Sequence, residues 1–328
     1  MARVFVTGAS GFIGGALATR LQERGDEIVA LARSDASAAA LGARGLKVVR
    51  GDVCDEDSLA RGMAGCELAY HVAGINSHCP PDPKLLLRVN ARGPELVVQA
   101  AARAGVKRVV YTSSGASVGE PKGTIGREDS VHRGSYLSAY DRSKHEGEQA
   151  AFAAAHRTGV EVVAVNPSSV QGPGRTTGNG KLMVDYVNGK LPVFVDTYLS
   201  VVDIADTTEA HILAADRGRP GARYVLNGAT LTSAEALELL DSIAGVKHRV
   251  RIVRPELAMA TAGALEAVYA LRGRVPSLCR ARIRTFLHGH QYDGSLAERE
   301  LGLVYTPVEE TFRRTIEWAR SEGLIDPA

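Results

Sequence analysis

Tyr140 and Lys144 are four residues apart in a stretch whose pattern predicts a helix, so both side chains lie on one helix face. A phenol has a pKa of about 10, and a neighbouring ammonium lowers that pKa. Ser114 follows a predicted strand and offers a hydroxyl to the same oxygen atom. The three residues predict proton transfer at a carbonyl oxygen, and the alternative is a solvated surface pair of Tyr140 and Lys144.

A glycine-rich turn near the start of the chain supplies a second chemical signal. A β-branched run at residues 3–7 predicts a buried strand, and Gly8, Gly11 and Gly14 separate it from a predicted helix at 12–24. Glycines allow the sharp turn and the close approach of a ligand's phosphates, and free N–H groups at the helix start face an anion. The turn therefore predicts a dinucleotide site, and a tight turn that binds nothing is the alternative.

Strands and helices alternate through the first half of the chain, which predicts an α/β fold. The expected strands are 3–7, 27–32, 46–50, 67–71, 107–112 and 160–165, and the expected helices are 12–24, 36–43, 56–63, 84–104 and 137–157. This order predicts a doubly wound parallel sheet with helices on both faces, because each crossover requires a helix. Ligands bind such sheets beyond the carboxyl ends of the strands.

The end of the second strand discriminates between the two nicotinamide cofactors. NAD sites place a carboxylate there, but this chain has Arg33 and Ser34, which suit the additional phosphate of NADP. Asp35 lies close enough to keep NAD open. Asp52 and Val53 follow the third strand and are expected to border the adenine, although Asp52 could instead cap the next helix.

These motifs resemble the extended short-chain dehydrogenase/reductase family, of the NAD-dependent epimerase/dehydratase type. Thr7, the three glycines, Asp52, His71-x-Ala73, Asn90, Ser114 and Tyr140-x-x-x-Lys144 occur in the family's order over nearly the whole chain. The resemblance implies a Rossmann-type domain, a Ser-Tyr-Lys catalytic set and an Asn90 that holds a water in the proton relay. Ser114 is chosen over its neighbour Ser113, and His71 is given no chemical role.

The resemblance also implies domain limits and binding residues. An NADP-binding Rossmann domain is expected at 1–166, with sheet returns from about 194–217, and a smaller, mainly substrate-binding domain at 167–328. The expected cofactor residues are Thr7, Gly8, Ser10, Gly11, Phe12, Ile13, Gly14, Arg33, Ser34, Asp52, Val53, Val72, Ala73, Gly74, Thr112, Ser113, Tyr140, Lys144, Pro167, Ser168, Ser169 and Val170. The expected substrate residues are Ser114, Asn76, Ser169, Gln171, Met183, Tyr186 and Tyr198.

The sequence favours NADP-dependent reduction of a ketone or aldehyde in a small, hydrophobic substrate, within the dihydroflavonol-4-reductase-like branch. Nucleotide-sugar epimerases in the family typically have a diphosphate-binding arginine where Asp196 aligns, and a carboxylate there would repel a diphosphate. A sugar or nucleotide-sugar epimerase or dehydratase is the alternative. A non-catalytic NADP-sensing protein is a third alternative, but such proteins generally lose the tyrosine and lysine, and this chain has both Tyr140 and Lys144.

Composition restricts the partners. The 328 residues contain 39 basic and 37 acidic side chains without a block of either sign, so neither a nucleic acid nor a membrane partner is expected. A cytoplasmic protein is expected, with Cys54, Cys66, Cys79 and Cys279 as reduced thiols. No metal site is predicted, and His288-Gly289-His290 is interpreted as a loop. The family resemblance suggests a homodimer through helices 84–104 and 137–157.

Overall fold

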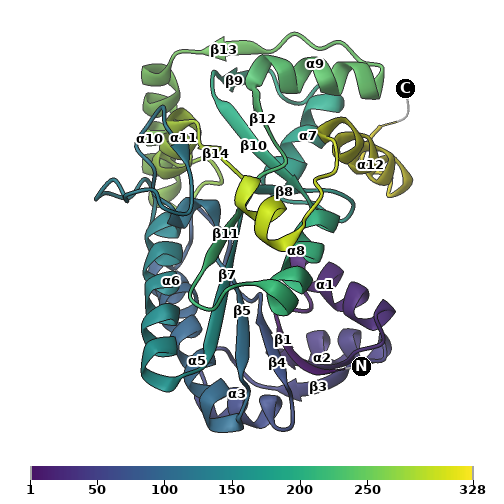
Figure 1. The fold of residues 1–328 in the computed structure, drawn as a ribbon. Coiled ribbons are helices and arrows are strands. Elements are labelled where there is room, and N and C mark those ends of the chain that lie inside the picture. Colours follow the sequence, from purple (N-terminus) through teal and green to yellow (C-terminus); the bar gives the residue numbers. More distant parts are fainter. Residues whose placement is uncertain (1, 327–328) are drawn as a thin grey trace.

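The central feature of the computed structural model, which describes residues 2–326, is a seven-stranded parallel sheet (Figure 1). The strand order is β11-β7-β5-β4-β1-β2-β3, so the chain runs outward in both directions from β1 and β4. The strands are β1 (Arg3–Thr7), β2 (Glu27–Ala32), β3 (Lys47–Arg50), β4 (Leu68–His71), β5 (Arg108–Thr112), β7 (Glu161–Pro167) and β11 (Arg223–Leu226). The predicted Rossmann-type, doubly wound α/β fold is confirmed.

Helices cover both faces of this sheet and bury two apolar layers. On one face, α1 (Phe12–Glu23), α2 (Asp35–Ala43) and α8 (Ile204–Arg217) contribute residues such as Leu17, Leu41 and Ile212 to one core. On the other, α3 (Glu56–Met63), α5 (Gly93–Ala104) and α6 (Ala139–Thr158) contribute residues such as Met63, Val97 and Ala151 to a second core. The sheet is therefore buried on both sides, as its continuous apolar strands require.

A smaller part of the chain lies beyond the carboxyl ends of the strands, in the upper half of Figure 1. Its strands are β8 (Ser169–Gln171), β9 (Val193–Val195), β10 (Tyr198–Asp203), β12 (Ala229–Thr232), β13 (Arg251–Val253) and β14 (Gln291–Tyr292), the last paired with β6 (Ile125–Gly126). Its helices are α7 (Asn179–Val187), α9 (Ser233–Ala244), α10 (Pro255–Ala270), α11 (Arg280–His288) and α12 (Val308–Ser321).

Residues 194–217 were expected to return to the central sheet, but the strand in this range belongs to another sheet. Strand β10 pairs with β8 and β12 in a separate three-stranded sheet, and the central sheet is instead extended by β11. The reason is geometric, because β8 follows β7 after a single residue and lies beyond the carboxyl end of the sheet. Only α8, within the predicted range, returns to the central sheet, where it packs on β5 and β7.

The helix predicted at 84–104 is divided by a π-helical turn. The structure has α4 (Pro83–Leu87), a π turn over Arg88–Arg92, and then α5. Asn90 lies in the π turn, so the widened backbone falls on a residue that the sequence singles out.

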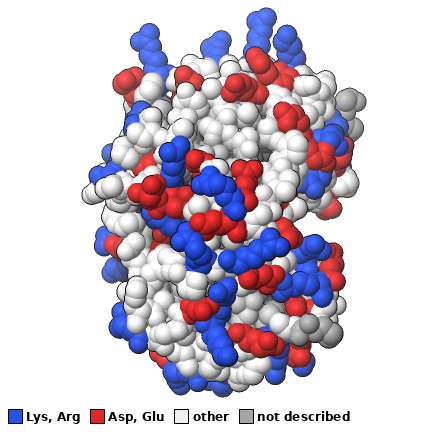
Figure 2. Space-filling model, viewed as in Figure 1, with Lys and Arg blue, Asp and Glu red and all other residues white. Residues whose placement is uncertain are grey.

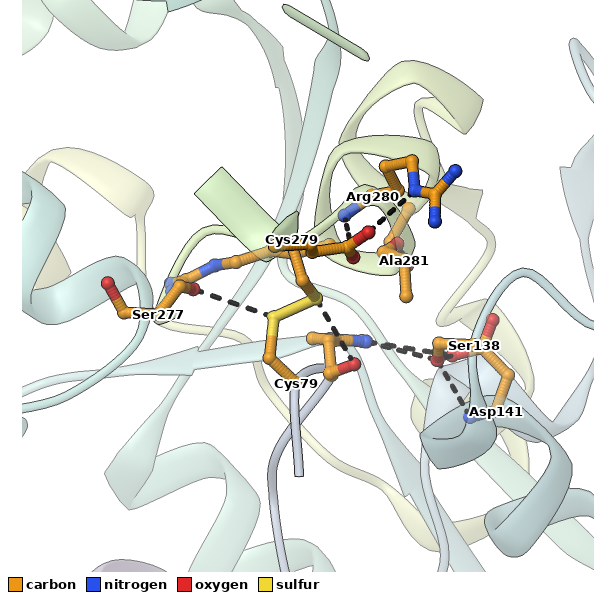
Figure 3. Close-up of a disulfide and its surroundings, with 11 residues drawn as sticks. Cys79, Ser138, Asp141, Ser277, Cys279, Arg280 and Ala281 are labelled. Atoms are coloured by element: carbon orange, nitrogen blue, oxygen red, sulfur yellow. Dashed lines mark hydrogen bonds and ion pairs between the residues drawn. A yellow bond between two sulfur atoms is a disulfide. The ribbon is translucent and has the colours of Figure 1, made fainter. Parts of the chain in front are cut away.

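Cys79 and Cys279 form a disulfide, which corrects the expectation of four reduced thiols (Figure 3). The two residues are 200 positions apart, and the fold brings the loop before α4 against the start of α11. Such a contact has no signature in local spacing. Cys54 and Cys66 are free.

Charged side chains of both signs are mixed over the face shown in Figure 2, in keeping with the sequence balance. Within residues 2–326, no helix combines the length and apolar character needed to cross a bilayer.

Candidate active site

One cavity of about 780 Å³ lies at the carboxyl ends of the central strands, between the sheet and the smaller part of the chain. It brings together almost all the predicted cofactor residues. Those lining it are Gly8, Ser10, Gly11, Phe12, Ile13, Gly14, Arg33, Ser34, Asp52, Val53, Val72, Ala73, Gly74, Thr112, Ser113, Tyr140, Lys144, Pro167, Ser168, Ser169 and Val170. The long cavity thus joins the glycine turn to the Tyr140 region.

The glycine turn has the backbone shape that a dinucleotide needs. Gly8 has φ of +77°, and a Cβ there would lie 2.7 Å from the backbone nitrogen of Ala73. A Cβ on Gly14 would lie 2.2 Å from the Gly8 carbonyl oxygen. Gly11 caps α1 without a side-chain hydrogen bond, so the first amides of the helix remain available to an anion. These residues fit the pyrophosphate of a nicotinamide dinucleotide.

Thr7 is the predicted cofactor residue that does not line the cavity. Its hydroxyl shares a 2.8 Å hydrogen bond with Nδ1 of His71 and accepts one from the Ala73 amide at 3.1 Å. Burial lowers the pKa of His71 to about 3, so its imidazole is neutral. Thr7 therefore joins the ends of β1 and β4 behind the glycine turn.

The cavity wall after β2 and β3 carries a cation and hydroxyl groups. Arg33, Ser34 and Ser37 line the cavity, and Ser34 also caps α2 by accepting a hydrogen bond from the Ser37 amide. Asp35 points elsewhere, toward Arg50 at 3.2 Å. Asp52 lines the cavity, whereas the cap of α3 is Asp55.

Ser114 and Tyr140 meet at the centre of the cavity. The Ser114 hydroxyl accepts a hydrogen bond from the Ala116 amide at 3.2 Å and lies near the Tyr140 phenol, while the Ser113 hydroxyl points away and donates to Ser117 at 3.2 Å. Burial raises the pKa of Tyr140, and the Ser114 hydroxyl and the charge of Arg175 oppose that rise. The phenol is therefore protonated near neutral pH and can donate a proton to a carbonyl oxygen.

Lys144 contacts the end of β5. Its ammonium donates to the Thr112 carbonyl at 2.8 Å and lies 5.2 Å from the centroid of the Tyr111 ring. The side chain thus points to the end of β5, although it shares the helix face of Tyr140. Burial lowers the pKa of Lys144 to about 8.

Asn90 is buried and does not line the cavity. Its amide donates to the Ile75 carbonyl at 2.9 Å and to Ser143 at 3.1 Å, and its oxygen accepts from the Ile75 amide at 2.8 Å. Both amide hydrogens are used within the protein. Asn90 therefore positions the segment after β4 against α6.

The predicted substrate residues divide into two groups. Asn76, Ser114, Ser169 and Tyr198 line the main cavity. Gln171, Met183 and Tyr186 instead line an adjacent apolar cavity of about 50 Å³ in the smaller part of the chain, which shares Asn179 and Leu199 with the main cavity. The helix α7 turns Met183 and Tyr186 toward α9 and α12, where the Tyr186 phenol donates to Asp241 at 2.5 Å.

Asp196 is exposed and does not line the cavity. The sequence analysis missed three basic residues that do line it: Arg175, Arg282 and His290. Arg175 lies four residues after Gln171, an expected substrate residue, so its chain position could have drawn attention to it. Arg282 and His290 reach the cavity through α11 and the segment after it, and only the tertiary structure places them there.

His288 and His290 converge on Glu120, an acid that the sequence pattern did not connect with them. His290 Nδ1 lies 2.5 Å from the Glu120 carboxylate, and His288 Nε2 lies 3.3 Å from the same oxygen. Two ligands of one tetrahedral ion are about 3.3 Å apart, so the shorter distance indicates a hydrogen bond. The two imidazoles lower the pKa of Glu120 to about 2, which keeps this buried carboxylate ionised.

Comparisons with known proteins identify the family. The family model described as "NAD dependent epimerase/dehydratase family" matches residues 4–226. A protein of Synechocystis sp. with the provisional name dihydroflavonol 4-reductase is 32% identical over 330 residues, covering 98% of this chain and 95% of that protein.

Two further relatives are similar over most of their length. The 4-hydroxy-2-methyl-3-oxo-4-farnesyl-3,4-dihydroquinoline-1-oxide ketoreductase of Stigmatella aurantiaca is 31% identical over 311 residues, covering 92% of this chain and 91% of that enzyme. The crystal structure of gox2253 has a TM-score of 0.86 and 28% identity, covering 99% of this chain and 100% of that one. The chain therefore belongs to the NAD-dependent epimerase/dehydratase family and is an NAD(P)-dependent enzyme of the extended short-chain dehydrogenase/reductase type.

Proposed function

We propose that this enzyme is an NADP-dependent reductase of a ketone or aldehyde. The observation that carries the proposal is the Ser114–Tyr140 pair in the main cavity, with a phenol whose pKa is raised by burial. A protonated phenol suits reduction, because the carbonyl oxygen must gain a proton as hydride reaches its carbon. The similarity to a ketoreductase supports the same chemistry.

A bound nicotinamide would supply or accept the hydride, and the protein groups manage the oxygen. Tyr140 donates its phenolic proton to the carbonyl oxygen, while Ser114 holds that oxygen by a hydrogen bond. The cation of Lys144 lies in the same cavity, within reach of a ribose hydroxyl. In this proposal the smaller part of the chain supplies the substrate wall.

The preference for NADP rests on Arg33. It lies exposed in the cavity wall with Ser34 and Ser37, whereas Asp35 is paired with Arg50 outside that wall. A cation flanked by hydroxyls matches a phosphate on the adenosine ribose better than it matches a hydroxyl.

The direct test is NADPH oxidation against a panel of ketones and aldehydes, comparing the parent with Tyr140→Phe. We expect turnover to fall by about 100-fold or more, the usual range for losing a positioned proton donor. Tyr136→Phe is the matched control, because that phenol is partly exposed and outside the cavity.

An epimerase or dehydratase would recycle its cofactor and consume no net NADPH. Conversion of UDP-glucose without net NADPH oxidation would therefore overturn the reductase proposal. Equal turnover by the parent and Tyr140→Phe would overturn the proposed role of the phenol.

A further inference from the structure

The wall of the main cavity opposite the cofactor loops is basic. Arg282 lines it from α11, His290 lines it from the segment after α11, and His78 lines it from the loop before α4. Among the described residues, Asp52 is the only carboxylate that lines the cavity, and it follows β3 at the cofactor end. A substrate in this region therefore faces the Arg282 guanidinium and two imidazoles without a lining carboxylate.

Most of the neighbouring basic groups already have an acidic partner. His290 lies 2.5 Å from Glu120, and His78 lies 3.9 Å from the buried carboxylate of Asp141. Arg282 differs, because within residues 2–326 it forms no ion pair and donates one hydrogen bond, to the Ser277 carbonyl at 3.0 Å. Most of its guanidinium donors remain available to a ligand.

Burial without a counter-charge is unfavourable for Arg282. Its side chain is half-buried in the cavity wall, and burial lowers its pKa. An anion that neutralises the guanidinium would recover part of this desolvation free energy. A bidentate carboxylate or phosphate is the ligand that best matches the planar donors of arginine.

Arg175, the other arginine at this end, has a different location. Its guanidinium lies 5.2 Å from the centroid of the Phe12 ring in the glycine turn, and its charge also acts on Tyr140. Arg175 thus lies next to the cofactor loops and the reacting centre. Arg282 lies on the substrate side, in the helix whose start is fixed by the Cys79–Cys279 disulfide (Figure 3).

We infer that the carbonyl substrate carries an anionic group, a carboxylate or a phosphate monoester, which Arg282 binds while Tyr140 and Ser114 hold the carbonyl oxygen. The inference rests on the proposed reductase function and makes the substrate class more specific. It adds a charged group to the small, hydrophobic substrate expected from the sequence. Phe286, which also lines this wall one turn after Arg282, supplies an apolar surface for the rest of the molecule.

The test uses matched pairs of carbonyl compounds that differ in charge. The pairs are 4-formylbenzoate and its methyl ester, 4-acetylbenzoate and its methyl ester, and dihydroxyacetone phosphate and dihydroxyacetone. The measured quantity is the ratio of kcat/KM for the anionic member to that for the neutral member, with NADPH as cofactor. The pair with the largest ratio distinguishes a carboxylate from a phosphate.

We expect the parent to favour the anionic member, and Arg282→Gln to lower the ratio by about 10- to 100-fold through KM. Arg282→Lys keeps the charge and should restore part of the ratio. Arg284→Gln is the matched control, because Arg284 is exposed on the same helix and outside the cavity. A parent that prefers the neutral members of all pairs, or a ratio unchanged in Arg282→Gln, would overturn the inference.

If no carbonyl compound is reduced, the reductase proposal fails. Binding measured by calorimetry then tests the anion site at Arg282 independently of turnover. Binding of 4-formylbenzoate or dihydroxyacetone phosphate to the NADPH-loaded parent, weakened at least 10-fold in Arg282→Gln, would retain the anion site. Absence of binding to the parent would overturn that site as well.

Discussion

The ammonium of Lys144 donates a hydrogen bond to the carbonyl oxygen of Thr112, 2.8 Å away, and not to the phenol of Tyr140. Lys144 is thereby anchored to the end of β5, and its charge is almost fully buried without a carboxylate in direct contact. The arrangement presents a cation to the cavity and is unfavourable for the stability of the protein alone.

Lys144→Met should therefore abolish most of the activity and stabilise the fold. A pKa lowered from 10.5 to about 8 corresponds to roughly 3 kcal/mol against the charged form at neutral pH. We expect the free energy of unfolding to rise by about 1–3 kcal/mol at pH 7. Chemical denaturation of both proteins measures the difference, with Lys122→Met as an exposed control.

The difference in stability between the parent and Lys144→Met should also depend on pH, with a defined sign. Between pH 8 and about 10.4 the folded parent has lost the Lys144 proton while the unfolded chain still binds it, so this contribution to parent stability rises with pH. The advantage of Lys144→Met should therefore shrink from pH 7 to pH 10. A constant advantage over that range would show that Lys144 is not titrating.

Arg33→Ala should weaken NADPH without a comparable effect on NADH. Loss of a charged hydrogen bond to a phosphate is worth about 1.5–3 kcal/mol, which predicts a roughly 10- to 100-fold rise in the NADPH dissociation constant. Arg50→Ala is the control, because Arg50 is a nearby cation that pairs with Asp35 outside the cavity. Unchanged NADPH binding in Arg33→Ala would remove the basis for an NADP preference.

The sequence predicted those parts of the fold that depend on local patterns. The spacing of Gly8, Gly11 and Gly14 and the alternation of strands and helices both correspond to observed elements. Each involves residues close together in the chain, where backbone preferences and periodicity carry the information.

The parts that could not be predicted depend on contacts between distant segments. Cys79 meets Cys279, and Glu120 meets His290, only because the smaller part of the chain folds over the strand ends. Met183 and Tyr186 have the right types for a substrate pocket, but the direction in which α7 presents them depends on its packing against α9 and α12. Chain position could not determine that direction.

Tyr186→Phe and Tyr198→Ala should distinguish the roles of the two cavities. Tyr186 donates a 2.5 Å hydrogen bond to Asp241 away from the site, so its loss should lower stability by about 1 kcal/mol and leave kcat/KM within twofold. Tyr198 lines the main cavity and is 46% exposed, so Tyr198→Ala should raise KM with little effect on stability. Thermal unfolding and steady-state kinetics measure both, and the reverse pattern would return Tyr186 to the substrate site.

The disulfide joins two walls of the substrate end, since the loop that carries Cys79 and the α11 helix after Cys279 both line the cavity. Replacing both cysteines by serine should lower the free energy of unfolding by about 2–4 kcal/mol, the usual range for a disulfide. Because Arg282 and Phe286 follow Cys279 on that helix, KM for the carbonyl substrate should rise several-fold while the dissociation constant for NADPH stays unchanged.

Dithiothreitol should give the parent the properties of the double variant and have no effect on the variant itself. Cys54→Ser is the control, because Cys54 is a free thiol. Alkylation of both Cys79 and Cys279 in the unreduced protein, detected by peptide mass spectrometry, would show that the bond does not form, and equal stability of parent and double variant would show that it does not tie the two walls together.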